Sequence, residues 1–347
     1  MSLIERNHSR SGTLPQALAA WLETVNTIAA QAAVNGVQPT PDTARQALAG
    51  LTRMYGGQGP ELARVCDFRL AGCPDIPLRL YDPCTKEGPD TGAAHEPGAH
   101  GPLLVYLHGG GHMAGSIDVY DPIMRRVAWH TGCRTLAVEY RLAPEHPYPH
   151  GLNDCLAVLR ALSAGTETLQ PDTRQGIRPL DTHHGIILAG DSGGGALAAT
   201  LTAQSVTDST LTITGQILVY PSLDYTLEYP STQSVGRGYL LETDRIRWYF
   251  DNYFQHGECR KAASPLNMPA AGLPPTLLFT GGFCPLRDEG YAYADHLRNN
   301  AAVCQHENFP DMIHAWLNIH TLAPKACEST YAVMGQWIQT ALSPPRV

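Results

Sequence analysis

The chain has 347 residues, of which 43% are hydrophobic and 16% charged, and its formal net charge is −8 at pH 7. This length is typical of one large domain with a smaller appendage. The acidic balance, without basic clusters, argues against nucleic acid or an anionic membrane surface as a partner, and no apolar run approaches the length of a bilayer span.

Cysteine usage and the first residues indicate a compartment. The nine cysteines are an odd number, widely spaced, and include no Cys-x-x-Cys pair. This pattern is typical of reduced thiols in a cytoplasmic protein rather than of disulfides or a metal cluster. The N-terminus has no uninterrupted apolar segment, so no signal peptide is predicted. We therefore expect a cytoplasmic protein without a bound metal.

The N-terminal region is predicted to be helical. Apolar residues near helical spacing predict helices over 14–34 and 41–55. Both helices precede the first predicted strands, at 62–70 and 77–81, which favours a lid over a site. A packing or dimer element is the alternative. Residues 84–101, rich in Gly, Pro, His and Thr, are expected to form an exposed loop.

A glycine run follows the next strand. Residues 102–107 have a buried-strand pattern and lead directly into His108-Gly109-Gly110-Gly111. Such glycines leave backbone N–H groups uncovered, where they can stabilise a developing oxyanion. His108 and His112 are four residues apart, like a helical metal pair, but the intervening glycines disfavour a helix and hence a zinc site. No Lys-Ser or Lys-Thr follows, which excludes a phosphate loop.

The strongest local signal lies at 190–194. After a helix near 121–131, a strand at 133–139, a helix at 151–162 and a polar insertion at 163–184, an apolar strand leads into Gly190-Asp191-Ser192-Gly193-Gly194. A helix from 196 to 203 follows. Strand, sharp turn and helix around G-x-S-x-G predict a nucleophile elbow, with the N–H of Gly193 completing an oxyanion hole. A merely flexible glycine loop is the alternative.

The remainder alternates strands and helices. Strands are predicted at 215–220, 275–281 and 302–309, and helices at 288–300 and 323–342. Residues 221–254 are irregular, then helical and rich in Tyr and Trp, so they either complete the lid or pack it on the sheet. This alternation predicts an α/β fold with a mainly parallel sheet covered by helices on both faces.

Several motifs in sequence resemble one family. Besides the two glycine motifs, these are the stretches at 140–145 and 285–290 and His314 before an aromatic residue. From about residue 100 to 320 the chain resembles the hormone-sensitive-lipase-like branch of the α/β-hydrolases, which contains bacterial carboxylesterases and acetyl esterases. The resemblance implies an α/β-hydrolase domain over 61–347, cap helices in 1–60 and a second cap segment near 221–256.

The resemblance also implies an activity and its residues. It predicts a carboxylesterase for short acyl esters with Ser192 as nucleophile and His314, in the loop after a late strand, as base. An ordinary surface histidine is the alternative for His314. The oxyanion hole would be formed by Gly109, Gly110, Gly111 and Gly193. No cofactor is implied, and a homodimer is compatible with the resemblance.

The acid of the triad departs from the family. The family has an aspartate where this chain has Cys284, so we expect a weakened or inactivated triad, natural or engineered. A thiolate is a weak substitute for the carboxylate. Asp288, one helical turn further on, is a substitute acid or simply charges the start of its helix. The different-class alternative is a non-catalytic receptor of the same fold that binds a ligand in the capped pocket.

Overall fold

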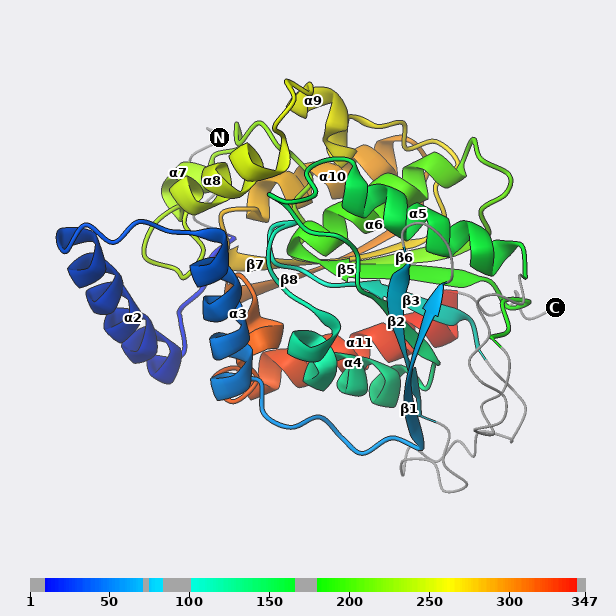
Figure 1. The fold of residues 1–347 in the computed structure, drawn as a ribbon, viewed down its shortest axis with the longest axis horizontal. Coiled ribbons are helices and arrows are strands. Elements are labelled where there is room, and N and C mark those ends of the chain that lie inside the picture. The colour runs from blue at the N-terminus through cyan, green and yellow to red at the C-terminus, as the bar shows by residue number, and fades with distance from the viewer. Residues whose placement is uncertain (1–9, 71–74, 84–100, 166–179, 342–347) are drawn as a thin grey trace.

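The computed structural model describes residues 10–70, 75–83, 101–165 and 180–341 (Figure 1). Nearly all of the loop predicted at 84–101 lies outside the described residues, as does the middle of the polar insertion at 163–184. No helix within the described ranges is long and apolar enough to cross a membrane.

The centre of the fold is one eight-stranded sheet with the order β1-β2-β4-β3-β5-β6-β7-β8. β2 runs antiparallel to β1 and β4, and all other neighbours are parallel, which confirms the predicted mainly parallel sheet. Such a sheet is buried on both faces. The strands are β1 (Arg64–Leu70), β2 (Ile76–Asp82), β3 (Leu103–Leu107), β4 (Thr135–Val138), β5 (Ile186–Asp191), β6 (Ile213–Val219), β7 (Thr276–Phe283) and β8 (Cys304–Ile313).

Helices cover the sheet on both sides, as Figure 1 shows, with α4 and α11 on one face and α5, α6 and α10 on the other. α2 and α3 stand beside the sheet, and α7 and α8 lie above its carboxyl edge. The helices are α2 (Gln16–Val34), α3 (Pro41–Tyr55), α4 (Ile117–Thr131), α5 (His150–Ser163), α6 (Ser192–Ser205), α7 (Ser231–Ser234), α8 (Thr243–Tyr253), α9 (Arg260–Ala263), η3 (Pro265–Asn267), α10 (Arg287–Asn299), η4 (Trp316–Ile319) and α11 (Pro324–Ala341).

Three boundaries differ from the predictions by about four residues. α4 begins at Ile117 rather than near 121, because the Ser116 hydroxyl accepts a hydrogen bond from the Val119 N–H and caps the helix. α6 begins at Ser192 itself, four residues earlier than predicted. β8 continues to Ile313 instead of ending at 309, since Ile313 still pairs with Phe283 after a register shift. His314 therefore follows the strand directly.

Candidate active site

The elbow depends on glycines at fixed positions. β5 ends at Asp191, and Ser192 adopts the left-handed conformation, with a φ of 52°, as it starts α6. A Cβ on Gly194 would lie 2.0 Å from the carbonyl oxygen of Leu107 in β3, and one on Gly190 would lie 2.5 Å from the carbonyl carbon of Gly194. Only glycine fits these two positions, and strand and helix then close on a strained serine at the carboxyl edge of the sheet.

The structure brings Ser192, His314 and Cys284 into one line. The Ser192 Oγ lies 2.9 Å from Nε2 of His314, and Nδ1 of the same ring lies 3.1 Å from the Cys284 Sγ. Each residue directly follows a strand of the parallel part of the sheet: Ser192 follows β5, His314 follows β8 and Cys284 follows β7. Because these strands share their direction, their carboxyl ends meet at one edge of the sheet.

Burial keeps the histidine and the thiol neutral. His314 is 5% exposed, and burial lowers the pKa of its ring to about 3. Cys284 is 1% exposed, and burial raises the pKa of its thiol. A thiolate–imidazolium pair is therefore disfavoured before substrate arrives. A neutral thiol is a weak donor and a weak acceptor, whereas a carboxylate only accepts, so Cys284 does not hold the ring proton on Nδ1 as a carboxylate would.

Asp288, the alternative acid, turns away from this line. Its Oδ1 accepts hydrogen bonds from Arg10 at 3.0 Å and from Arg287 at 2.8 Å, and its Oδ2 lies 3.3 Å from Arg287. Both carboxylate oxygens thus face guanidinium groups, and the hydrogen-bond partners described for the His314 ring are Ser192 and Cys284. Arg10 lies 278 residues from Asp288. No local sequence signal points to this partner.

The glycine run lies beside the elbow. Gly110 and Gly111 have φ values of 117° and 63°, which L side chains rarely adopt. A Cβ on Gly193 would lie 3.2 Å from the nitrogen of Gly111 and 3.1 Å from that of His112. The N–H of Gly109, in contrast, donates to Asp191 at 2.8 Å. Gly109 therefore ties the loop to Asp191, whereas no hydrogen bond described for these residues uses the N–H groups of Gly110, Gly111 and Gly193.

Asp191 is a residue that the sequence reasoning did not single out. It is 1% exposed and accepts hydrogen bonds from the Gly109 N–H at 2.8 Å, the Tyr106 hydroxyl at 3.1 Å and the Tyr120 hydroxyl at 2.9 Å. Burial raises the pKa of its carboxyl to about 7, and the two tyrosine hydrogen bonds act against that rise. Asp191 thereby ties the glycine loop to the elbow. Its place directly before Ser192 was the available signal.

Two segments outside the sheet touch the glycine loop. Cδ2 of Leu48 in α3 lies 3.1 Å from the position that a Cβ on Gly110 would occupy. Cγ of Tyr249 in α8 lies 2.7 Å from the position that a Cβ on Gly111 would occupy. A cluster of aromatic rings is buried against His112, whose ring stacks on Tyr253 at 3.9 Å. The other members of this cluster are Tyr225, Phe250 and Phe254.

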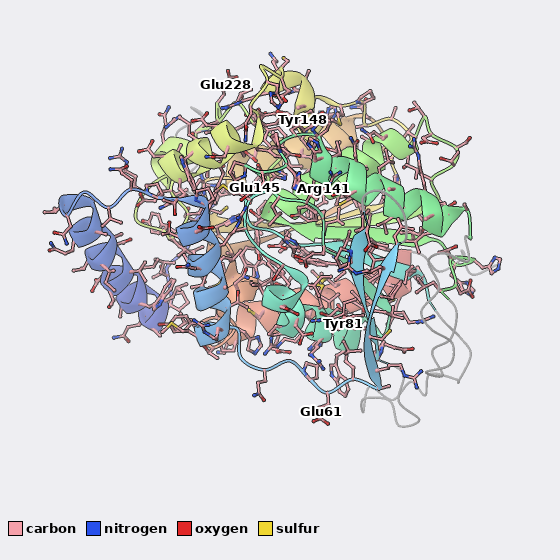
Figure 2. The ribbon with its side chains drawn as sticks, in the orientation of Figure 1. Glu61, Tyr81, Arg141, Glu145, Tyr148 and Glu228 are labelled. Carbon is pink, nitrogen blue, oxygen red and sulfur yellow. The ribbon has the colours of Figure 1, made fainter. Side chains whose placement is uncertain are left out.

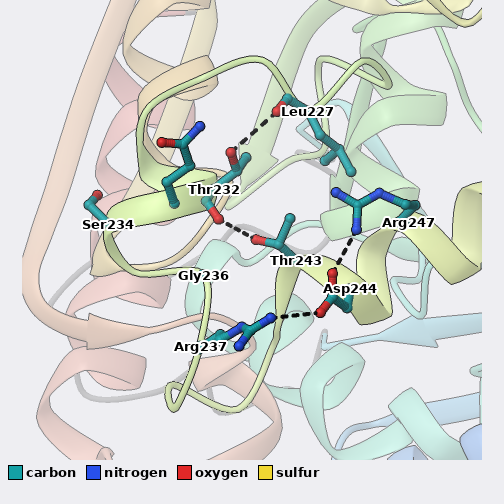
Figure 3. A pocket seen from close by; sticks show the side chains of 9 residues that line it. Leu227, Thr232, Ser234, Gly236, Arg237, Thr243, Asp244 and Arg247 are labelled. Carbon is teal, nitrogen blue, oxygen red and sulfur yellow. Dashed lines mark hydrogen bonds and ion pairs between the residues drawn. The ribbon is translucent and has the colours of Figure 1, made fainter.

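A separate pocket of about 360 Å³ is formed by the segment that contains α7 and the start of α8 (Figure 3). Its lining includes Arg237 and Arg247, both of which pair with Asp244, and none of the residues in line with Ser192. Across the described ranges, no group of three His, Cys, Asp or Glu side chains is arranged to hold a metal ion.

Comparison with known proteins adds to this geometry. A family model described as alpha/beta hydrolase fold matches residues 104–318. The chain is similar to the carboxylesterase NlhH of Mycobacterium tuberculosis, with 31% identity over 75% of this chain and 76% of that protein. It is also similar to the ethyl acetate hydrolase of Pseudomonas putida, with 29% identity over 84% of this chain and 88% of that protein.

Solved structures of hydrolases also superpose on this fold. One similar structure is a mutant of LAE6, an alpha/beta hydrolase from the metagenome of Lake Arreo in Spain. It superposes with a TM-score of 0.79 at 29% identity and covers 95% of this chain and 100% of that one. The hyperthermophilic esterase of Pyrobaculum calidifontis superposes with a TM-score of 0.78 at 25% identity, over 96% of this chain and 100% of that one.

Proposed function

Since the chain belongs to the alpha/beta-hydrolase family, in the hormone-sensitive-lipase-like branch that its motifs indicate, we propose that it hydrolyses carboxylic esters through an acyl-enzyme on Ser192. Its relatives are carboxylic ester hydrolases, and the chain is one as well. The observation that carries the proposal is the 2.9 Å contact between the Ser192 Oγ and Nε2 of His314 at the elbow.

The reaction has two balanced halves. The Ser192 Oγ attacks the ester carbonyl carbon while its proton passes to Nε2 of His314, and the resulting oxyanion accepts hydrogen bonds from Gly110, Gly111 and Gly193. Collapse of this intermediate expels the alcohol, which takes the proton from Nε2 and leaves an acyl-Ser192. Water then attacks the acyl group by the same route, its proton passes through His314 to the Ser192 Oγ, and the carboxylic acid leaves.

Cys284 weakens both halves. To accept the serine proton, Nε2 must be free, so Nδ1 must carry the ring hydrogen and point it at an acceptor. A buried neutral thiol accepts that hydrogen weakly, and as an S–H donor it favours the opposite tautomer. It also provides no charge to stabilise the imidazolium formed in the transition state. Neutralising the corresponding aspartate of a serine protease lowers turnover about 10⁴-fold.

The acyl group is expected to be short. Leu48 and Tyr249 rest on the glycines that would face the substrate carbonyl, and the aromatic cluster is buried against the neighbouring His112. Bulky side chains against the glycines that would bind the carbonyl oxygen favour acetyl or similarly small groups. On this proposal α2, α3 and the α7–α8 segment form the cap. Cys66, Cys155, Cys259, Cys284, Cys304 and Cys327 are free thiols, which supports a cytoplasmic location.

The test compares kcat/KM for p-nitrophenyl butyrate between the chain and its Cys284→Asp variant, with Ser192→Ala as the blank. A rise of about a hundredfold or more is expected, because the carboxylate restores the tautomer and the charge. Fast turnover by the unaltered chain with little change would place the acid elsewhere, and Asp288→Asn would then identify or exclude Asp288. Retained activity in Ser192→Ala would refute the nucleophile. Hydrolysis by neither protein would favour a ligand-binding role.

A further inference from the structure

The oxyanion loop, residues 108–115, is poorly supported by its own backbone. Gly110, Gly111, His112 and Gly115 all have positive φ. Inside the loop, the Gly110 carbonyl accepts hydrogen bonds from the Met113 N–H at 3.2 Å and the Ala114 N–H at 2.9 Å. A run of sparsely populated conformations persists only where the surroundings fix it. Contacts from other elements must therefore hold this loop.

Arg45 of α3 makes several of these contacts at once. Its Nε donates to the Met113 carbonyl at 2.9 Å, and its Nη2 donates to the Ala143 carbonyl at 3.0 Å. Nη1 and Nη2 also pair with both carboxylate oxygens of Glu145, at 3.0 and 2.5 Å. Figure 2 labels Glu145 at the level of α3. The planar fork of a guanidinium can satisfy all these acceptors together, which an ammonium cannot.

The same helix contacts both sides of the site. Leu48 lies three residues after Arg45, on the same face, and rests against Gly110. At the other end of α3, the Thr52 hydroxyl accepts from the Asn318 side chain at 3.0 Å, and the Tyr55 carbonyl accepts from the Thr321 N–H at 2.8 Å. Both partners follow His314 in the chain. α3 thus connects the oxyanion loop to the segment after the base.

We propose that Arg45 is a positioning residue for ester hydrolysis. By holding the Met113 carbonyl, it fixes the direction in which the Gly110 and Gly111 N–H groups point. The inference rests on the proposed function, since it takes those groups as the oxyanion donors. The oxyanion exists only after attack on the carbonyl, so a displaced loop costs transition-state binding much more than substrate binding.

The test uses Arg45→Met, which keeps the apolar stem without the donors, and Arg45→Lys, which keeps the charge without the fork. Glu145→Gln removes the ion pair but leaves the Met113 and Ala143 carbonyls bound, and Arg53→Met changes an exposed arginine of the same helix. In Arg45→Met, kcat for p-nitrophenyl acetate should fall about tenfold to a hundredfold, with KM changed less than about threefold, because the donors are misplaced rather than removed. Arg45→Lys should lose less, and both controls should stay near the unaltered chain.

A second readout separates this inference from the proposed function. A trifluoromethyl ketone forms a tetrahedral oxyanion adduct with an activated serine, so its Ki should rise in Arg45→Met by the factor by which kcat/KM falls. If the unaltered chain neither hydrolyses the ester nor binds the ketone, the proposed function fails. If it does both, while a folded Arg45→Lys or Arg45→Met keeps kcat and Ki, the inference alone fails. A loss of kcat in Glu145→Gln equal to that in Arg45→Met would also overturn it.

Discussion

At the scale of single residues, the strength of His314 as a base depends on its neighbour, the Cys284 Sγ. The His314 ring has Ser192 on one side and Cys284 on the other, and the Tyr220 ring packs against it at 4.7 Å. Burial raises the pKa values of Cys284 and Tyr220, and also that of Glu289, a carboxyl group that acts electrostatically on the thiol. Burial therefore disfavours the charged form of all three groups. Without a facing negative charge, nothing opposes the burial that lowers the pKa of His314.

This environment predicts an unusual dependence of activity on pH. A histidine acts as a base only above its own pKa, and that of His314 is about 3. We therefore expect kcat/KM of the unaltered chain to stay level from about pH 8 to about pH 5, although its absolute value is low. In Cys284→Asp, the new carboxylate stabilises the imidazolium and raises this pKa, so the acidic limb should move to higher pH.

The measurement is kcat/KM against pH for both proteins, with circular dichroism at each pH to confirm that the fold is retained. The same acidic inflection near neutral pH in both profiles would contradict the explanation, because the charge at position 284 would then have no influence on His314.

At the scale of elements, the approach of α6 to β3 depends on the absence of one side chain. A Cβ on Gly194 would lie 2.0 Å from the Leu107 carbonyl and 2.4 Å from that of His108, and backbone atoms cannot move aside cheaply. Gly194→Ala should therefore destabilise the fold by about 3 kcal/mol or more and displace Ser192. Urea unfolding and kcat measure the two effects.

Gly50 in α3 provides the matched control. It lies inside a helix, and nothing stands within 4 Å of the position that its Cβ would occupy. Gly50→Ala should increase the free energy of unfolding by about 1 kcal/mol, because alanine has the higher helix propensity, and should leave kcat unchanged. Equal effects of the two substitutions would show that packing at the elbow is not the reason for the glycine.

At the scale of the whole molecule, the sequence predicts what neighbouring residues determine. The elbow, the strand order along the chain and the place of His314 after a late strand are local patterns, and the fold class follows from them. Arg10, the second partner of Asp288, lies 278 residues away, and Glu145, a partner of Arg45, lies 100 residues away; neither carries a local signature. The use of the Gly109 N–H by Asp191 was equally invisible, because a glycine pattern does not show where each N–H points.

The same long-range contacts attach the first described residues to the far end of the sheet. The Gly12 N–H donates to the Pro310 carbonyl at 2.9 Å, and the Thr13 N–H donates to Asp311 at 2.7 Å. Arg10 pairs with Asp288 and lies over the Tyr291 ring at 3.9 Å. Residues 10–13 therefore bind the strand end that leads into His314 and the helix that follows Cys284.

Deleting residues 1–13 should weaken the packing of the strand end before His314 and of the helix after Cys284, while leaving the sheet intact. The loss of the Arg10 charge leaves Asp288, which is 4% exposed, with fewer partners, and the end of β8 loses two hydrogen bonds. We expect the deletion to lower the free energy of unfolding by about 3 kcal/mol, which corresponds to a fall in Tm of about 4 °C for a chain of this size. Turnover should fall as well, because His314 is then held less firmly against Ser192. Deletion of residues 1–9 alone is the control, since it keeps every one of these contacts, and an equal fall in Tm for both deletions would assign the effect to the residues before Arg10.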